Sequence, residues 1–367
     1  MKLIALKDVC KINMGQSPNS SSYNDYGDGM PFFQGNADFG ERYPITRVWC
    51  NTPTKIAQAE DILISVRAPI GALNYAKEEC CIGRGLAAIT PDRNKVSQDF
   101  IYWALKGKKA ELNDKGNGST FKAISRKILE ETMIPDINFE QQHKCAENLE
   151  KIYGIIQNRR KELLALDDLI KARFVEMFGS PVSNPMSWEK RTLKEVCIKL
   201  NDGSHFSPES FETGDYKYVT AKNIKFSGFD FSNITYVPEA VHRPIFDRCN
   251  PEFEDVLYIK DGATTGVAIV NTLDEEFTLL SSVALLKQDR SIMNGYFLAT
   301  LLNNKDMYLN IRNNMGGAAI TRLTIAKLNA IEIIVPPIEL QNQFAAFVAE
   351  VDKSKVAVQK ALDETQT

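Results

Sequence analysis

Acidic side chains close to a lysine form the pattern in this sequence that most resembles a catalytic site. Glu209 is followed by Asp215-Tyr216-Lys217 in a turn-rich stretch. Paired carboxylates can bind Mg²⁺, and a neighbouring lysine can help to activate water. Such short combinations are common by chance. A self-contained Mg²⁺-dependent nuclease is therefore kept as an alternative to be tested.

Other residue patterns that carry chemistry are missing from the sequence. Its three histidines, His143, His205 and His242, are not spaced for a metal site, and its seven cysteines contain no Cys-x-x-Cys pair. There is no Walker A phosphate loop, no Gly-x-Gly-x-x-Gly after a strand, and no Asn/Asp-Pro-Pro-aromatic motif of the kind amino-methyltransferases use. We therefore expect no catalytic residues, no metal and no cofactor in this chain, and reduced, mostly buried thiols.

Composition restricts the class of protein further. The 367 residues are 44% hydrophobic and 25% charged, which suits two globular domains. No apolar run approaches the ~18 residues of a membrane span, and the first residues are not typical of a signal peptide, so we expect a cytoplasmic protein. Residues 1–139 carry 18 Lys and Arg against 16 Asp and Glu (+2), and residues 188–335 carry 16 against 19 (−3). These balances argue against strong non-specific DNA binding and leave specific binding through clustered charge open.

The elements that must position any site are duplicated along the chain. Short segments recur in the same order, at offsets that drift from 187 (Leu6 and Leu193) to 199 (Gly116 and Met315) before the last pair. The pairs are Leu6–Cys10 with Leu193–Cys197, Glu60–Leu63 with Glu254–Leu257, Gly71–Ala72 with Gly266–Val267, Leu86–Ile89 with Val283–Leu286, the glycine patches Gly116–Ser119 with Met315–Ala318, and Ile134–Gln142 with Val335–Gln341. We infer two copies of one module; two independent α/β domains are the alternative.

Each copy combines short strands and short helices. Runs of β-branched and aromatic residues predict strands at Asp61–Val66, Tyr216–Thr220 and Val256–Lys260. Helices are expected between them, at Ser97–Leu105 and Asn294–Asn303. The predicted fold class is α+β, with two tandem α/β domains that each contain a twisted mixed sheet.

A long amphipathic helix is predicted after each domain. Glu140–Phe178 contains no proline, and apolar residues recur there every seven positions. At about 1.5 Å per residue this helix spans roughly 58 Å, more than one such domain can cover. Residues 336–367 show a similar stripe, so we expect the two helices to pair as an antiparallel coiled coil. Packing of each helix on its own domain, or an intermolecular dimer, is the alternative. The expected pairing residues are Leu149, Ile152, Ile156, Leu163, Leu166, Ile170, Val348, Val351, Val358 and Leu362.

Several segments resemble the specificity subunit (HsdS) of type I restriction-modification systems. They are Gly29–Asn36, Ser65–Gly71, Cys81–Ile89, and the junction of Phe174–Gly179 with Asn184-Pro185 and Trp188. The resemblance covers the whole chain. It implies a first target recognition domain at 1–139, a long spacer helix at 140–179, a linker at 180–187, a second target recognition domain at 188–335, and a shortened second helix at 336–367.

The same resemblance implies a function and a set of partners. Each domain would read one half of a bipartite, asymmetric double-stranded DNA target. Two methyltransferase subunits and restriction (motor) subunits would modify or cut the DNA, and S-adenosylmethionine, ATP and Mg would bind to those partners. The short final helix and the absence of a helix before Leu6 depart from the family pattern and leave the distal helix contacts open. A coiled-coil scaffold without a DNA function is the other alternative.

Candidate DNA contacts are polar side chains in the loops of both domains. Arginine and lysine suit guanine and phosphate, whereas asparagine and glutamine suit adenine. In the first domain the candidates are Gln16, Ser17, Gln34, Asn36, Arg67, Arg84, Lys115, Asn117, Ser119 and Lys122. In the second they are Ser204, His205, Lys222, Asn223, Thr264, Thr265, Arg312, Asn313 and Arg322. Because these sets differ while the scaffold repeats, we expect two different half-targets.

Overall fold

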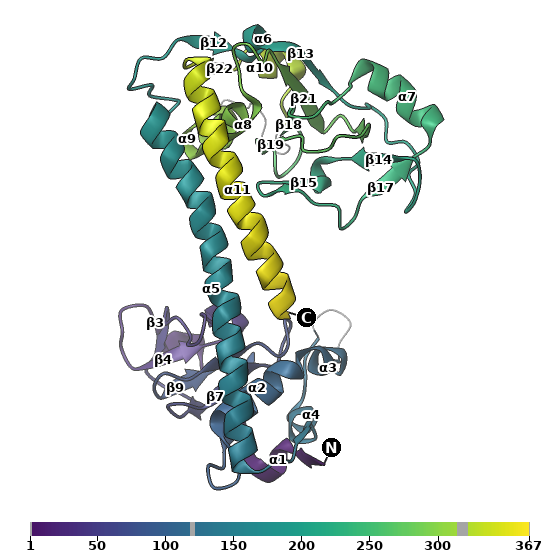
Figure 1. The fold of residues 1–367 in the computed structure, drawn as a ribbon. Coiled ribbons are helices and arrows are strands. Elements are labelled where there is room, and N and C mark those ends of the chain that lie inside the picture. The colour runs from purple at the N-terminus through teal and green to yellow at the C-terminus, as the bar shows by residue number, and fades with distance from the viewer. Residues whose placement is uncertain (1, 118–121, 314–321, 367) are drawn as a thin grey trace. The chain divides into compact units, whose positions relative to one another are not determined.

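The computed structural model describes residues 2–117, 122–313 and 322–366 of the chain (Figure 1). These residues divide into two compact units, Met1–Ile155 and Ile156–Thr367. Each unit has its own hydrophobic core and is described by itself. Among the residues covered, no helix has both the length and the apolar character needed to span a membrane.

The first unit is built on an antiparallel sheet whose central strands are largely buried. Its order is β2 (Cys10–Met14), β10 (Leu86–Pro91), β7 (Ile62–Ser65) and β8 (Leu73–Tyr75). A second sheet joins β3 (Tyr23–Asn24), β5 (Trp49–Cys50), β4 (Met30–Phe33), β9 (Cys80–Ile82) and β6 (Ile56–Ala57). Strand β1 (Leu3–Ala5) pairs with β11 (Met133–Pro135). The helices of this unit before the long one are α1 (Leu6–Val9), α2 (Gln98–Gly107), α3 (Lys109–Asp114) and α4 (Arg126–Glu130), with 3-10 turns at Ser20–Ser22 and Asn36–Asp38.

The second unit repeats this plan. Its main antiparallel sheet has the order β13 (Cys197–Asp202), β21 (Val283–Gln288), β18 (Val256–Ile259) and β19 (Ala268–Val270). Smaller sheets join β17 (Thr235–Val237), β14 (Tyr216–Val219) and β20 (Thr278–Leu279), and β15 (Ile224–Lys225) with β16 (Gly228–Phe229). Strand β12 (Lys190–Thr192) pairs with β22 (Glu332–Ile334) as β1 pairs with β11. The helices are α6 (Leu193–Val196), α7 (Glu239–Arg248), α8 (Gly295–Asn303), α9 (Lys305–Asn313) and α10 (Ile325–Asn329), with a 3-10 turn at Ala221–Asn223.

The predicted elements lie within a few residues of the observed ones. Strands β7, β14 and β18 and helices α2 and α8 occupy the expected positions. Among the described residues, parallel pairs occur outside the main sheets: β4 runs parallel to β9 in the second sheet of the first unit, and β14 runs parallel to β20 in the second unit. The main sheets are antiparallel throughout. The central strands β7 and β18 are buried on both faces, so they read as continuous apolar runs that resemble those of a parallel sheet.

A buried glutamine attaches the start of each long helix to its domain. In the first unit, Gln142 accepts a hydrogen bond from the Ser97 amide (2.7 Å) and donates one to the Ile137 carbonyl (2.8 Å). In the second unit, Gln341 accepts from the Asn294 amide (2.9 Å) and donates to the carbonyls of Ile292 (3.0 Å) and Pro336 (2.7 Å). Ser97 and Asn294 are the N-cap residues of α2 and α8. The repeated glutamine therefore links the start of the long helix to the start of the matching short helix in both units.

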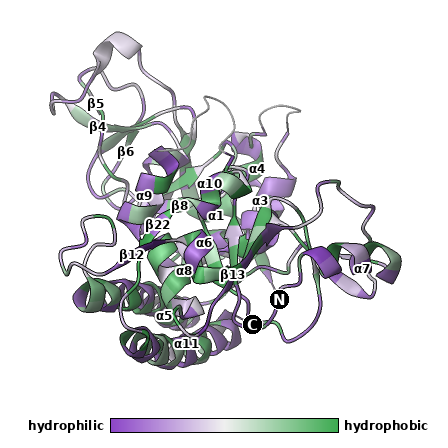
Figure 2. Cartoon of the chain, turned by 90° about the horizontal axis from the view of Figure 1, so that it is seen from above, coloured by the Kyte–Doolittle hydropathy of each residue, from purple (hydrophilic) through white to green (hydrophobic). Residues whose placement is uncertain are grey.

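The two long helices are α5 (Phe139–Phe178) and α11 (Ile338–Gln366). Within the second unit they contact each other: the rings of Phe174 and Phe344 lie 5.6 Å apart, and Lys355 Nζ lies 2.7 Å from an Asp167 carboxylate oxygen. Both helices carry apolar residues beside polar ones (Figure 2). On α11 the predicted residues Val348, Val351, Val358 and Leu362 are buried, and on α5 Ile156, Leu163, Leu166 and Ile170 are half-buried.

Two residues of the predicted helix seam lie elsewhere. Leu149 and Ile152 are each 41% exposed. In this first-unit part of α5, Gln142 and Ala146 are buried, and Tyr153 packs against the domain core. The helix therefore turns a different face to its domain, and the expectation of buried pairing residues is wrong for Leu149 and Ile152. The heptad spacing identified an apolar stripe but not what covers it.

The cysteines agree with the expectation of reduced, mostly buried thiols. All seven are free, and five are buried: Cys10, Cys50, Cys80, Cys81 and Cys249. Burial raises the pKa of the Cys80 thiol to about 12. Cys145 on α5 is exposed.

Candidate nucleic-acid interface

Backbone hydrogen bonds join four loops of the first unit that are far apart in sequence. The Gln16 amide donates to the Ile82 carbonyl (3.0 Å), and the Gly85 amide donates to the Gln34 carbonyl (3.1 Å). The Val66 amide donates to the Gly85 carbonyl (2.9 Å). These bonds hold together the segments after β2, β4, β7 and β9. The loops that carry Gln16, Ser17, Gln34, Asn36, Arg67 and Arg84 are thereby brought together.

A cavity of about 480 Å³ lies among these loops and contains three of the predicted contacts, Gln34, Asn36 and Arg67. Phe32 and the Ala68-Pro69 segment complete part of its wall. Arg67 and Arg84 are both exposed, and neither makes an ion pair among the described side chains. The site therefore offers free cations beside amide groups, which suits a phosphate backbone and base edges.

The second polar loop of this unit lies next to the first group. The Asn117 and Ala123 backbones exchange two hydrogen bonds of 3.0 Å, and Ala123 also bridges to Arg67. The Lys122 carbonyl accepts from the Ala68 amide (3.1 Å), so exposed Lys122 and Asn117 are close to Arg67. Lys115 is held 2.7 Å from Glu111. Ser119 lies outside the described residues.

The second unit forms a matching group of loops. The Ser204 amide donates to the Leu279 carbonyl (2.7 Å), as Gln16 does to Ile82. The Lys260 amide donates to the Ser282 carbonyl (2.9 Å), as Val66 does to Gly85. Exposed side chains in or near these loops include His205, Lys222, Thr264, Asn313 and Arg322. Arg312 is half-buried and donates to the Thr265 carbonyl (2.8 Å) and to the Tyr308 hydroxyl (3.1 Å).

Three predicted contact residues of the second unit are buried, so the expectation of exposed loop positions is wrong for Ser204, Asn223 and Thr265. The Ser204 hydroxyl donates to the Phe206 carbonyl (2.6 Å). The Asn223 side chain accepts from the Thr220 amide (3.0 Å), and the Thr265 hydroxyl donates to the Gly262 carbonyl (2.7 Å). Small polar residues of this kind stabilise turns, and from sequence alone they cannot be distinguished from ligand contacts.

A charged cluster beneath these loops was not predicted from the sequence. The Lys260 side chain is 2% exposed, and its Nζ lies 2.8 Å from Asp261 and 3.3 Å from Asp202. His205 Nε2 lies 3.1 Å from Asp202, and Arg322 Nε lies 3.3 Å from Asp261. Buried charges persist only when they are paired, as here. Lys260 directly follows the apolar strand β18 (Val256–Ile259), and a charged residue at the end of such a strand was the signal in the sequence.

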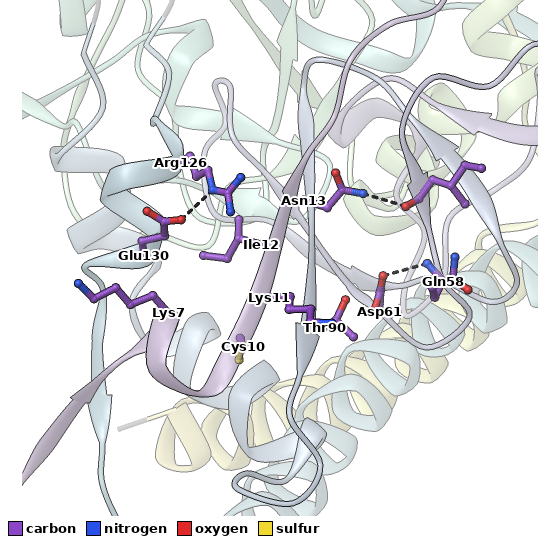
Figure 3. Close-up of a pocket in the computed structure, with 11 residues that line it drawn as sticks. Lys7, Cys10, Lys11, Ile12, Asn13, Gln58, Asp61, Thr90, Arg126 and Glu130 are labelled. Atoms are coloured by element: carbon purple, nitrogen blue, oxygen red, sulfur yellow. Dashed lines mark hydrogen bonds and ion pairs between the residues drawn. The ribbon is translucent and has the colours of Figure 1, made fainter.

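Another cavity, of about 540 Å³, lies beside β2 in the first unit (Figure 3). Lys7, Lys11, Arg126 and buried Asp61 help to line it, and Arg126 is paired with Glu130 at 2.7 Å. Burial is the main cause that raises the pKa of Asp61. None of the predicted DNA contacts lines this cavity, so it is separate from the loop group.

The nuclease-like residues do not form a metal site in the part of the chain that is described. Lys217 is paired with Glu275, whereas Glu209 and Asp215 are exposed. No cluster of three His, Cys, Asp or Glu side chains suited to a metal ion occurs among the described residues. His242 is buried, stacked on Tyr216, and bonded to Thr278 (2.8 Å).

The duplicated domain, the long helices and the loop groups define a class of DNA-specificity proteins. The family model of the type I restriction modification DNA specificity domain matches residues 1–165 and 185–365, so the chain belongs to the family of type I restriction-modification specificity subunits.

Two relatives from Methanocaldococcus jannaschii support this family. The chain is 47% identical over 152 residues to the putative type I restriction enzyme MjaX specificity subunit, a match that spans 41% of this chain and 36% of that relative. It is 24% identical over 389 residues to the MjaIX specificity subunit, covering 97% and 88% of the two chains. The structure of a type I restriction-modification S subunit from M. genitalium is similar in fold, with a TM-score of 0.61 at 16% identity, and the match covers 100% of this chain and 92% of that one.

Proposed function

We propose that each unit of this specificity subunit binds one half of a bipartite, asymmetric double-stranded DNA target. The observation that carries the proposal is the pair of loop groups, which share main-chain hydrogen bonds but present different side chains. Two DNA-binding units on the same scaffold would recognise two different half-targets. The contact residues we propose are the exposed members of the predicted set, and Ser204, Asn223 and Thr265 would hold the loops in shape.

We further propose that the long helices form an antiparallel coiled coil that acts as a spacer. The Phe174–Phe344 and Lys355–Asp167 contacts support the pairing. Exposed apolar residues on α5, such as Leu164 and Leu169, leave surface on which two methyltransferase subunits could dock. Restriction (motor) subunits would join the complex. The DNA target would place the protein in the cytoplasm.

In this proposal the chain directs adenine methylation and restriction without catalysing either. S-adenosylmethionine, ATP and Mg would bind to the partner subunits. Lys217 of the nuclease-like pattern is paired with Glu275, which supports assigning the chemistry to the partner subunits.

The test is co-expression of this chain with a type I methyltransferase subunit in a host without other methylation, followed by sequencing of methylated bases. We expect methyl-adenine in one split, asymmetric motif that disappears when this chain is omitted. Methylation without such a motif would refute the proposal. Cleavage of plasmid by the purified chain with Mg²⁺ would favour a nuclease instead. Absence of any gel shift with the methyltransferase present would favour a scaffold.

A further inference from the structure

Main-chain hydrogen bonds identify equivalent positions in the two loop groups. The Ile124 amide donates to the Val66 carbonyl (2.9 Å), and the Leu323 amide donates to the Lys260 carbonyl (2.8 Å). One residue away, Arg67 bridges to Ala123 in the first unit, and Asp261 bridges to Arg322 in the second. Arg67 therefore corresponds to Asp261, and Ala123 corresponds to Arg322. The arginine has changed from one side of the bridge to the other.

The second unit holds its arginine through a carboxylate. Asp261 contacts Arg322 through one oxygen, on the Nε side of the guanidinium, and Lys260 through the other. Lys260 is buried and also contacts Asp202, so this lysine fixes the position of the Asp261 carboxylate. The Arg322 side chain remains 60% exposed. This ion-pair contact is on the Nε side of the guanidinium, so among the described residues its two terminal amino groups have no charged partner and form a planar fork.

The surrounding charge favours a base edge over a phosphate as the partner of that fork. A phosphate at Arg322 would approach the Asp261 carboxylate, and like charges repel at such distances. Guanine offers two uncharged acceptors, N7 and O6, spaced for a bidentate arginine. Arg67 makes no ion pair among the described residues and has no such restriction. Its free charge suits a phosphate.

We infer that Arg322, positioned by Asp261 and Lys260, reads a guanine in the half-target of the second unit, whereas Arg67 anchors a phosphate in the first. The inference rests on the proposed DNA-reading function. It assigns Asp261 and Lys260 as positioning residues and names the base that Arg322 recognises.

The experiment uses the full chain in complex with its methyltransferase partner. Binding is measured on the methylated motif and on duplexes that carry each single base-pair change, at several salt concentrations. For Arg322→Ala we expect affinity for the motif to fall about 5- to 150-fold, with discrimination lost at one G·C pair. For Arg67→Ala we expect weaker binding to every duplex and a salt slope reduced by about 0.9.

Asp261 is tested through Asp261→Asn and Asp261→Ala. Both variants should lose discrimination at the same G·C pair as Arg322→Ala, and Asp261→Ala should bind random DNA more tightly because Arg322 is freed. A merely structural role would not affect one base pair selectively. Lys327→Ala removes an exposed charge from helix α10 and is the matched control, expected to keep the full motif. Thermal unfolding checks that each variant is folded; if Asp261→Ala is not, Asp261→Asn and Arg322→Ala decide the result.

The outcomes separate the inference from the proposed function. If the unsubstituted complex has no sequence preference, the proposed function fails. If that complex is selective but Arg322→Ala keeps every base preference, or loses affinity uniformly with a lower salt slope, then the guanine assignment is overturned and the DNA-reading function stands.

Discussion

Replacement of the buried glutamine at the start of each long helix should destabilise the two units unequally. Gln341→Ala removes three side-chain hydrogen bonds and leaves the Asn294 amide and the carbonyls of Ile292 and Pro336 without that partner. Gln142→Ala removes two bonds, to Ser97 and Ile137. An unsatisfied buried polar group costs about 1–3 kcal/mol. Because water can partly fill the vacated space, we use the lower part of that range for each group. We expect the free energy of unfolding to fall by about 3–5 kcal/mol for Gln341→Ala and by about 2–4 kcal/mol for Gln142→Ala.

Hydrogen exchange with mass spectrometry resolves where each loss falls. Gln341→Ala should speed exchange in α8, and Gln142→Ala should speed exchange in α2. Each 1.4 kcal/mol corresponds to about tenfold where exchange follows opening of the unit. The neighbouring Gln343→Ala and Gln141→Ala are the controls, because both side chains are exposed. Equal costs for the buried and exposed glutamines, or faster exchange in the opposite unit, would refute the role given to these hydrogen bonds.

Three further predictions concern packing, charge and thiol reactivity. A Cβ at Gly203 would overlap the Leu279 carbonyl, so Gly203→Ala should lower the free energy of unfolding by about 1–3 kcal/mol. Gly107 has open space around it, so Gly107→Ala should not lower it; urea denaturation measures both variants. Burial lowers the pKa of Lys355, but its bond to Asp167 and the charge of Asp352 outweigh this and raise the pKa overall. Lys355→Met should therefore lower the free energy of unfolding by about 0.5–1 kcal/mol below pH ~10, and this difference should fade as the pH rises through the folded pKa. Exposed Lys353→Met is the control, and an equal loss of stability in both variants would contradict the prediction. A thiol reagent at neutral pH should label one cysteine quickly, and Cys145→Ser should remove that fast phase; rapid labelling that survives in Cys145→Ser would contradict it.

The sequence was sufficient to predict features that depend on local pattern. The helix expected over Glu140–Phe178 is α5 (Phe139–Phe178), and the repeated segments among the described residues occupy matching elements of the two units. The pattern could not show which faces are covered: Leu149 and Ile152, expected to be buried in a helix pair, are exposed. It also could not show the pairing of Lys260 with Asp202, because that ion pair joins residues 58 positions apart (260 − 202).

The pattern of identity between the two units shows how one scaffold can carry two specificities. Where a side chain makes the structural bond, both units keep the same residue: Asn13 and Asn201 each donate to a carbonyl of a neighbouring strand or helix end, and Asp61 and Asp255 each accept from an amide three residues earlier.

Where the bond shared by the two units is made by the main chain, the side chains differ: Gln16 corresponds to buried Ser204, and Arg67 corresponds to Asp261. Main-chain hydrogen bonds do not depend on side-chain identity, so these positions can change charge without a change of fold. Substitution of an exposed side chain such as Arg67, which makes no ion pair among the described residues, should therefore alter DNA binding at little cost in stability. Substitutions at positions where a side chain makes the structural bond should unfold the loops before any change of preference can be measured.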